Sequence, residues 1–201
     1  MTKAITCMKC GAPLQLTNPD VRTIKCEFCD VINQLDIEQN PAKMGKFVPK
    51  KASTGPLKVG MKGNFRGQQP FTVSGVLEYS EDGDTWYEYM CEFSDGTLGW
   101  LQYDDGDWTM YFKKRLKSPV PPGVRSNSRI NVNGMSVTVE EVGTARITHV
   151  EGQIPFAVDY EDDIDYIDGW TEDDKAISIE MAEDEVELFV GREVSRGMLG
   201  L

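Results

Sequence analysis

The sequence predicts a mainly β protein, in which a four-cysteine zinc ribbon is followed by an antiparallel all-β barrel or sandwich. Two Cys-x-x-Cys pairs stand near residue 1, and short β-rich segments separated by Asp-Gly and Asn-Gly turns fill most of the remaining chain. No amphipathic helical pattern longer than two turns interrupts these segments.

The first module is residues 1–40, which we expect to bind one structural Zn²⁺ ion. Its four candidate ligands are Cys7, Cys10, Cys26 and Cys29, with fifteen residues between the two pairs. Four thiolates at this spacing are typical of a closed tetrahedral site, which is structural rather than catalytic. Two disulfides or a thioredoxin-like redox pair are the alternatives, but no apolar signal core precedes the pairs and no βαβ pattern surrounds them.

The residues around the cysteines favour a small fold that the metal stabilises. Gly11 and Asp30 follow the two pairs at matching positions, and both residue types accept the positive φ that the exit of such a turn needs. Segments 14–16 and 22–24 alternate around an Asn-Pro-Asp turn, which predicts a hairpin, and 31–35 would supply a third strand. About forty residues cannot bury enough apolar surface to fold alone, so the metal must supply the difference.

Residues 41–57 are predicted to form a flexible basic linker. Three prolines, two glycines and four lysines leave this segment without a steady periodicity. A solvated spacer is the plain interpretation, and a basic contact strip is the alternative.

Residues 58–193 are expected to form an acidic all-β domain, with 194–201 as a C-terminal tail. Strands are predicted at 71–79, 85–93, 97–103, 108–112, 129–132, 135–139, 144–150, 164–167, 176–181 and 186–190. Strands of this length at regular spacing favour a barrel or a sandwich. The halves 58–117 and 124–193 share a rhythm of β-run and acidic turn, which suggests two related units.

The net charge of −12 is distributed unevenly along the chain. Residues 1–51 hold eight Lys/Arg and five Asp/Glu, a balance of +3, whereas residues 52–201 hold thirteen and twenty-eight, a balance of −15. The β region would therefore repel polyphosphate backbones and anionic lipid surfaces. No run of about eighteen apolar residues predicts a membrane span. With the thiolate cluster and the missing signal core, we expect a reduced, cytoplasmic setting.

Three tryptophans are candidate partner-binding residues. Trp86, Trp100 and Trp108 stand beside acidic turns. Large aromatic residues at such places either pack in the core at the end of a barrel or line a groove for a peptide.

The acidic stretch 159–174 is the other candidate for partner binding, with nine carboxylates in sixteen residues. We interpret it as a solvated loop in which Asp162, Asp163 and Asp165 would attract a partner with a basic surface. A Ca²⁺ or Mg²⁺ site is the alternative, although the calcium-loop spacing is missing. The only histidine, His149, is expected at the surface or rim, and Cys91 in the core.

Two groups of motifs stand out in the β region. The first group comprises Gly60, Val73–Leu77, Trp86–Glu88, Gly99–Leu101 and Trp108, and the second comprises His149–Pro155, Tyr166–Asp168, Ile177–Glu180 and Gly191. Together these motifs resemble a domain of unknown function that is common in bacteria, family 4178. The resemblance covers about 130 residues of this chain and implies an all-β domain without an established activity, in some members behind a similar ribbon. It also leads us to expect an acidic residue at position 153, where this chain has Gln.

We expect a non-catalytic adaptor that docks protein partners through the ribbon and the acidic domain. The resemblance suggests a role accessory to a bacterial envelope-stress system. A nucleic-acid-binding ribbon is the first alternative, with phosphate contacts from Lys3, Lys9, Arg22, Lys25, Lys43, Lys46, Lys50 and Lys51. A small-molecule enzyme is the second, and no catalytic grouping of residues favours it.

Overall fold

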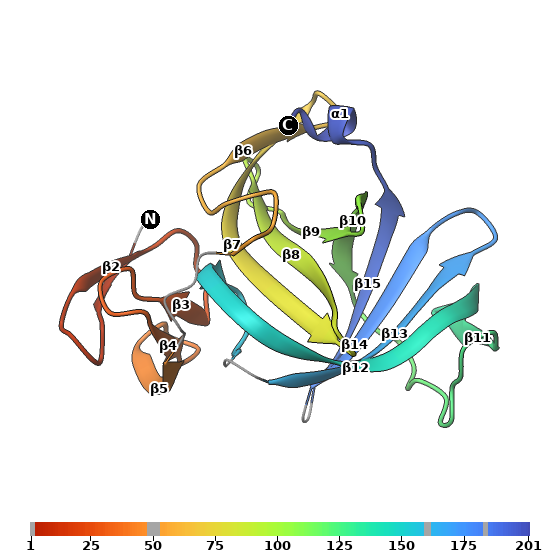
Figure 1. The fold of residues 1–201 in the computed structure, drawn as a ribbon, viewed down its shortest axis with the longest axis horizontal. Helices are drawn as coiled ribbons and strands as arrows, with labels where there is room; N and C mark the ends of the chain where they lie inside the picture. The colour runs from red at the N-terminus through yellow and green to blue at the C-terminus, as the bar shows by residue number, and fades with distance from the viewer. Residues whose placement is uncertain (1–2, 48–52, 159–161, 183–184) are drawn as a thin grey trace.

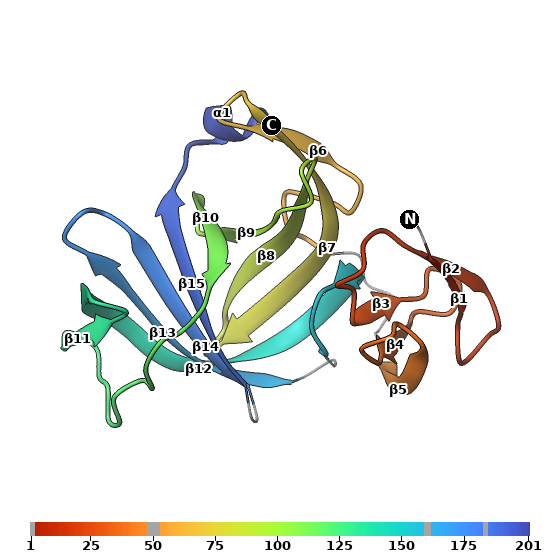
Figure 2. The same cartoon turned by 180° about the vertical axis from the view of Figure 1, so that it is seen from behind.

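The protein consists of a closed β-barrel with a small ribbon packed against one side (Figure 1). The computed structural model describes residues 3–47, 53–158, 162–182 and 185–201. Seen from behind, the ribbon again lies beside the barrel and contacts it at the end of β12 (Figure 2).

Eight antiparallel strands close the barrel, which confirms the predicted antiparallel all-β architecture. They are β7 (Gln69–Glu81), β8 (Asp84–Phe93), β9 (Leu98–Asp104), β10 (Asp107–Lys114), β12 (Met135–Ile154), β13 (Asp163–Thr171), β14 (Ala176–Ala182) and β15 (Glu185–Glu193). The first four form one meander and the last four form another. The meanders join where β7 pairs with β12 and where β10 pairs with β15. The predicted units 58–117 and 124–193 are therefore the two halves of a single barrel.

Three hairpin turns lie at the Asp-Gly and Asn-Gly dipeptides that predicted them. Both residues have positive φ at Asp82-Gly83, Asp105-Gly106 and Asn133-Gly134. This is the conformation of a type I′ turn, whose twist matches that of the strands it joins. Local turn chemistry thus sets the hairpin β7–β8, the hairpin β9–β10 and the small hairpin between β11 (Arg129–Val132) and β12.

Strand β12 differs from the prediction, because one strand of 20 residues replaces the two expected at 135–139 and 144–150. A register shift between Val139 and Glu141 bends it without ending it. Along its length β12 pairs with β11 and β13, then with β7, and finally with β3 of the ribbon. Gly152 allows the last change of partner, since its φ is +75° and a Cβ there would lie 2.2 Å from the Ser74 carbonyl oxygen.

The ribbon contains five short strands, β1 (Lys3–Thr6), β2 (Pro13–Leu16), β3 (Thr23–Lys25), β4 (Val31–Leu35) and β5 (Pro41–Phe47). The hairpin predicted between 14–16 and 22–24 is wrong: β2 pairs with β1, and β3 pairs with β4. Each pair of strands encloses one Cys-x-x-Cys turn, so the cysteine turns rather than the Asn-Pro-Asp turn close the hairpins. The predicted flexible linker 41–57 also needs correction, because residues 41–47 form β5 against β4. Residues 48–52 lie outside the described part of the chain.

The ribbon is attached to the barrel by hydrogen bonds along a short seam. Thr23, which is fully buried, donates through Oγ1 to the Phe156 carbonyl oxygen at 2.7 Å and accepts from the Val158 N–H at 3.1 Å. Gln153 accepts from the Thr17 N–H at 2.9 Å and donates to the Gln15 carbonyl oxygen at 2.9 Å. A carboxylate at position 153 could not donate this second bond, which gives the glutamine a role here.

Hydrophobic residues pack on both sides of the barrel wall. One cluster lines the lumen, a second lies on the outer face of β7–β10, and a third lies on the outer face of β12–β15 under residues 116–130. The predicted tail 194–201 belongs to the second cluster, because Val194 and Leu199 are buried there. It carries the short helix α1 (Arg196–Leu199), beside β6 (Lys62–Phe65).

Candidate metal centre and acidic barrel

The four predicted cysteine ligands meet at one point of the ribbon. Their sulfur atoms all lie within 4.8 Å of one another, with 3.7 Å between Cys7 and Cys29 and 3.7 Å between Cys10 and Cys26. The two turns have the same backbone pattern: Gly11 N–H donates to the Cys7 carbonyl, and Asp30 N–H donates to the Cys26 carbonyl. Gly11 and Asp30 have φ of +74° and +59°, as predicted. The four sulfurs are therefore placed to hold one metal ion.

A buried asparagine that the sequence interpretation missed holds the first turn in place. Asn33 is fully buried, accepts from the Met8 N–H at 2.9 Å, and directs its amide at the Cys7 sulfur at 3.7 Å. Burial alone would raise the pKa of the Cys7 thiol. The N–H groups of Cys10 and Lys9 and the Asn33 amide have the larger, opposite effect, so the net pKa is lowered to about 6. Donors aimed at a sulfur stabilise its thiolate, which is the form that binds metal. The sequence signal that could have identified Asn33 was a polar residue in the middle of the largely apolar strand β4.

Two of the three predicted partner-binding tryptophans are in the core. Trp100 is only 6% exposed and packs on Phe156 inside the barrel, and Trp108 is 7% exposed on the opposite face of the wall. Neither ring can form a docking surface, so the core-packing alternative holds for both. Trp86 is half-buried and lies inside the lumen, stacked on Tyr79 with ring centroids 5.5 Å apart.

The acidic stretch is largely a strand rather than the expected solvated loop, because residues 163–171 form β13. Asp163 and Asp165 point outward, where Asp163 pairs with Arg146 at 2.9 Å. Asp162 is half-buried at the mouth of the barrel. Residues 159–161 are outside the described part. Within the described ranges, the four cysteines form the only group of three or more His, Cys, Asp or Glu residues placed to share a metal ion.

The two other reactive side chains, His149 and Cys91, are both buried. His149 was expected at the surface or rim but is buried, 3.3 Å from Glu151 on the same strand. Cys91 is buried as predicted, and burial raises the pKa of its thiol well above the usual range.

Several predicted phosphate contacts are engaged within the ribbon. Lys25 pairs with Asp30 at 3.5 Å, Lys3 donates to the Glu38 carbonyl, and Arg22 donates to two backbone carbonyls. The side chain of Lys46, and Lys50 and Lys51 entirely, fall outside the described residues.

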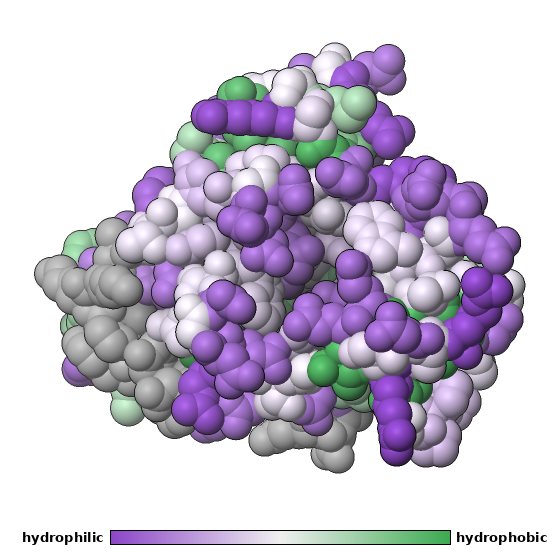
Figure 3. Space-filling view, turned by 45° about the vertical axis from the view of Figure 1, so that its right-hand side comes forward, coloured by the Kyte–Doolittle hydropathy of each residue, from purple (hydrophilic) through white to green (hydrophobic). Residues whose placement is uncertain are grey.

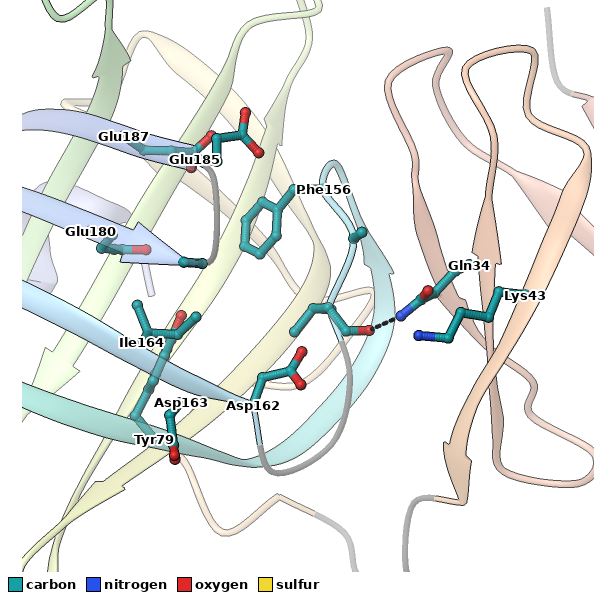
Figure 4. A pocket seen from close by; sticks show the side chains of 13 residues that line it. Gln34, Lys43, Tyr79, Phe156, Asp162, Asp163, Ile164, Glu180, Glu185 and Glu187 are labelled. Atoms are coloured by element: carbon teal, nitrogen blue, oxygen red, sulfur yellow. Dashed lines mark hydrogen bonds between the residues drawn. The ribbon is translucent and has the colours of Figure 1, made fainter.

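A hollow of about 660 Å³ lies between the ribbon and the mouth of the barrel (Figure 4). Gln34 and Lys43 approach it from the ribbon, and Gln34 donates to the Val158 carbonyl at 3.3 Å. Acidic side chains of β14 and β15 face it from the barrel, among them Glu180 and Glu187.

The lumen behind this mouth contains carboxylates that the sequence interpretation missed, namely Glu88, Asp168 and Glu180. Burial and the charge of Asp168 raise the pKa of Glu88 to about 8. Burial, with nearby glutamates, raises the pKa of Asp168 to about 7 although Ser178 lowers it. Glu180 also has a raised pKa, through burial and repulsion from Glu88. The sequence did contain a signal for these carboxylates, because side chains two positions apart on a strand point to the same face. Asp168, for example, lies two positions after Tyr166, which faces the lumen.

The fold and the site define a two-part protein, in which a ribbon with four cysteines placed to hold a metal ion is joined to an acidic barrel. The family model "Domain of unknown function (DUF4178)" matches residues 58–196, so the chain belongs to this family. The match spans the whole barrel and confirms the resemblance found in the motifs. Comparison with the curated proteins and with the solved structures gives no significant match. In the described part of the chain, no helix has the length and apolarity needed to cross a membrane.

Proposed function

We propose that the protein is a non-catalytic adaptor whose ribbon holds one structural Zn²⁺ ion and docks a protein partner. The observation that carries this proposal is the exposure of large apolar side chains on the ribbon. Among the described residues, eight large hydrophobic side chains are exposed, and Met8, Phe28, Ile37 and Met44 belong to the ribbon. Half of them thus lie on less than a quarter of the chain.

Zinc is the ion that best suits the four sulfurs. A tetrahedral site with Zn–S bonds of about 2.3 Å has sulfur atoms about 3.8 Å apart. The two measured separations of 3.7 Å agree with this geometry. All four ligand positions are occupied by protein, which favours a structural role. A reducing compartment such as the cytoplasm would keep the thiolates available.

The two cysteine turns form the proposed docking surface, which we call the knuckle surface and define as Met8 and Phe28. Met8 is 43% exposed and Phe28 is 69% exposed. Each stands inside a Cys-x-x-Cys turn, and both turns converge on the same four sulfurs. The metal would therefore hold both side chains at one end of the ribbon. Exposed, rigidly held Phe and Met side chains are common anchors in protein interfaces.

The acidic outer surface of the barrel would contribute a second, electrostatic contact. Asp163 and Asp165 are exposed on β13, and hydrophilic residues cover most of the face in Figure 3. A partner with a basic surface would be attracted at long range by the balance of −15 over residues 52–201.

The proposal is tested by affinity capture from source lysate with the full zinc-loaded chain, treated with nuclease. The bait variant is Met8→Asp/Phe28→Asp, and the matched control is Met198→Asp, which changes a methionine 49% exposed on the barrel side. We expect one protein partner that the wild type and the control retain and the knuckle variant loses.

Two results would contradict the adaptor. If the Met8→Asp/Phe28→Asp variant retained the same partner, the knuckle surface would not be the docking surface. Loss of every partner on nuclease treatment would instead favour the nucleic-acid alternative, which a salt titration of RNA or DNA binding would then quantify.

A further inference from the structure

We propose that the lumen of the barrel binds a linear aliphatic amine that carries two or more ammonium groups. This site lies inside the barrel and is independent of the knuckle surface, so either proposal can fail without the other. Its basis is the shape of the lumen, its charge, one buried oxygen atom without a partner, and its aromatic wall.

Three hollows lie along the lumen, and each shares lining residues with the next. The mouth beside the ribbon shares Tyr79, Ile164 and Glu180 with a narrow middle hollow of about 20 Å³. The middle hollow shares Trp86 and other side chains with an outer hollow of about 700 Å³ at the other end of the barrel. A volume of 20 Å³ accommodates one water-sized group, which is also the size of an ammonium head.

Acidic side chains dominate the polar lining of the middle and outer hollows. Glu88, Asp168 and Glu180 face the middle hollow, and the outer hollow is lined by Glu81, Asp82, Asp84, Asp104, Asp105 and Glu141. Neither lining includes a Lys, Arg or His residue. At the ribbon mouth, two described lysines lie near the acidic residues: Lys43 lines the hollow, and Lys113 pairs with Glu187.

One carboxylate oxygen of Asp168 lacks a hydrogen-bond donor among the described residues. Its Oδ1 atom is buried and has no hydrogen-bond partner in the described structure. Buried carboxylate oxygens are almost always paired, because an unpaired one loses its hydration without compensation. Asp168 lines both the middle and the outer hollow, so a positively charged donor there would satisfy this atom.

The wall of the lumen is aromatic beside Asp168. Trp86 stacks on Tyr79 and meets the edge of Tyr166, with ring centroids 5.9 Å apart in the second contact. Aromatic faces attract alkylammonium groups and also pack well against methylene chains. The Tyr166 hydroxyl donates to Glu81 at 2.5 Å, which holds this part of the wall in place.

The spacing of the carboxylates favours an extended organic cation over a metal ion. In the part of the chain that the structure describes, no three carboxylate oxygens come close enough to share one ion. The acidic groups are instead distributed from the middle hollow to the outer one. One ammonium group beside Asp168 and a second beside Asp104 and Glu141, joined by methylenes along Trp86, would neutralise both clusters. The raised pKa values of Glu88 and Asp168 agree with such unneutralised crowding.

The test is isothermal titration calorimetry of the full zinc-loaded chain with 1,4-diaminobutane and 1,8-diaminooctane. At about pH 8.5 alkylammonium groups remain charged. We expect saturable binding of one diamine, weaker binding of butylamine, and a Kd that rises about 10- to 100-fold in Asp168→Asn. The matched control is Asp165→Asn on the outer face of the same strand, which should leave the Kd unchanged.

A second measurement does not depend on any variant. In protein labelled at its tryptophan indoles, the NMR signal of Trp86 should shift on titration, whereas that of Trp108 on the other face of the wall should not. Three results would overturn the proposal: no saturable binding of either diamine, equal affinity in Asp168→Asn, or displacement of the diamine by Ca²⁺ at equal concentration.

Discussion

Replacing Thr23 with Val tests how firmly the ribbon is joined to the barrel. Val is β-branched like Thr, so the change replaces the hydroxyl with a methyl group and keeps the shape of the side chain. That hydroxyl serves the Phe156 carbonyl at 2.7 Å and the Val158 N–H at 3.1 Å, in a residue with no exposed surface. Leaving a buried polar group unpaired costs about 1–3 kcal/mol. Because the carbonyl keeps a second lone pair, we expect a loss of about 2–4 kcal/mol for the two groups together.

The measurement is urea unfolding of the zinc-loaded protein with two signals. All four tryptophans belong to the barrel, so their fluorescence reports its unfolding, while a zinc indicator reports release from the ribbon. Thr138→Val, at an exposed position of β12, is the matched control and should change stability by no more than about 0.5 kcal/mol. If Thr23→Val stayed as close to wild type as this control, the hydrogen-bonded seam would not be what joins the two parts.

Three further outcomes follow from the same geometry. Gly152→Ala should destabilise the barrel by about 2 kcal/mol or more, because its Cβ would collide with the Ser74 carbonyl. Gly123→Ala has a similar φ but open space, and should lose only about 1 kcal/mol. Chelation of the metal should lower the melting temperature of the barrel as well as unfold the ribbon, by about 2–4 °C for each kcal/mol of lost seam energy; calorimetry showing an unchanged barrel transition would contradict this coupling. The folded-state pKa values of Glu88 and Asp168 are raised to about 8 and about 7, so the native state binds more protons than the unfolded chain. Unfolding free energy should therefore fall as the pH rises from 6 towards 8.5, and Glu88→Gln/Asp168→Asn should flatten that slope; an equal slope in the double variant would refute the assignment.

The coupling of ribbon and barrel is where sequence interpretation reached its limit. The spacing of the cysteines and the Asp-Gly and Asn-Gly dipeptides predict local turns, and these were placed correctly. Each depends only on a few adjacent residues. Strand partners over long distances depend on packing instead. Nothing in the residues of β3 distinguishes pairing with β12 from pairing with β2, and the independent ribbon predicted over 1–40 is instead continuous with the barrel.

The same limit explains why the carboxylates inside the barrel were not predicted. A strand alternates its side chains between two faces, and sequence alone does not say which face becomes the lumen once the sheet closes. On β13, Asp163 and Asp165 share one face and Tyr166 and Asp168 the other, so a single acidic stretch contributes both outer-surface and lumen charge. Ordinarily the inward face of a small barrel is filled with apolar side chains. Here Glu88, Asp168 and Glu180 lie among the apolar and aromatic side chains of that face, and burial raises the pKa values of Glu88 and Asp168 because it disfavours their charged forms. Buried acids that weaken the packing of a core are expected where a binding site, rather than packing, has determined the residues.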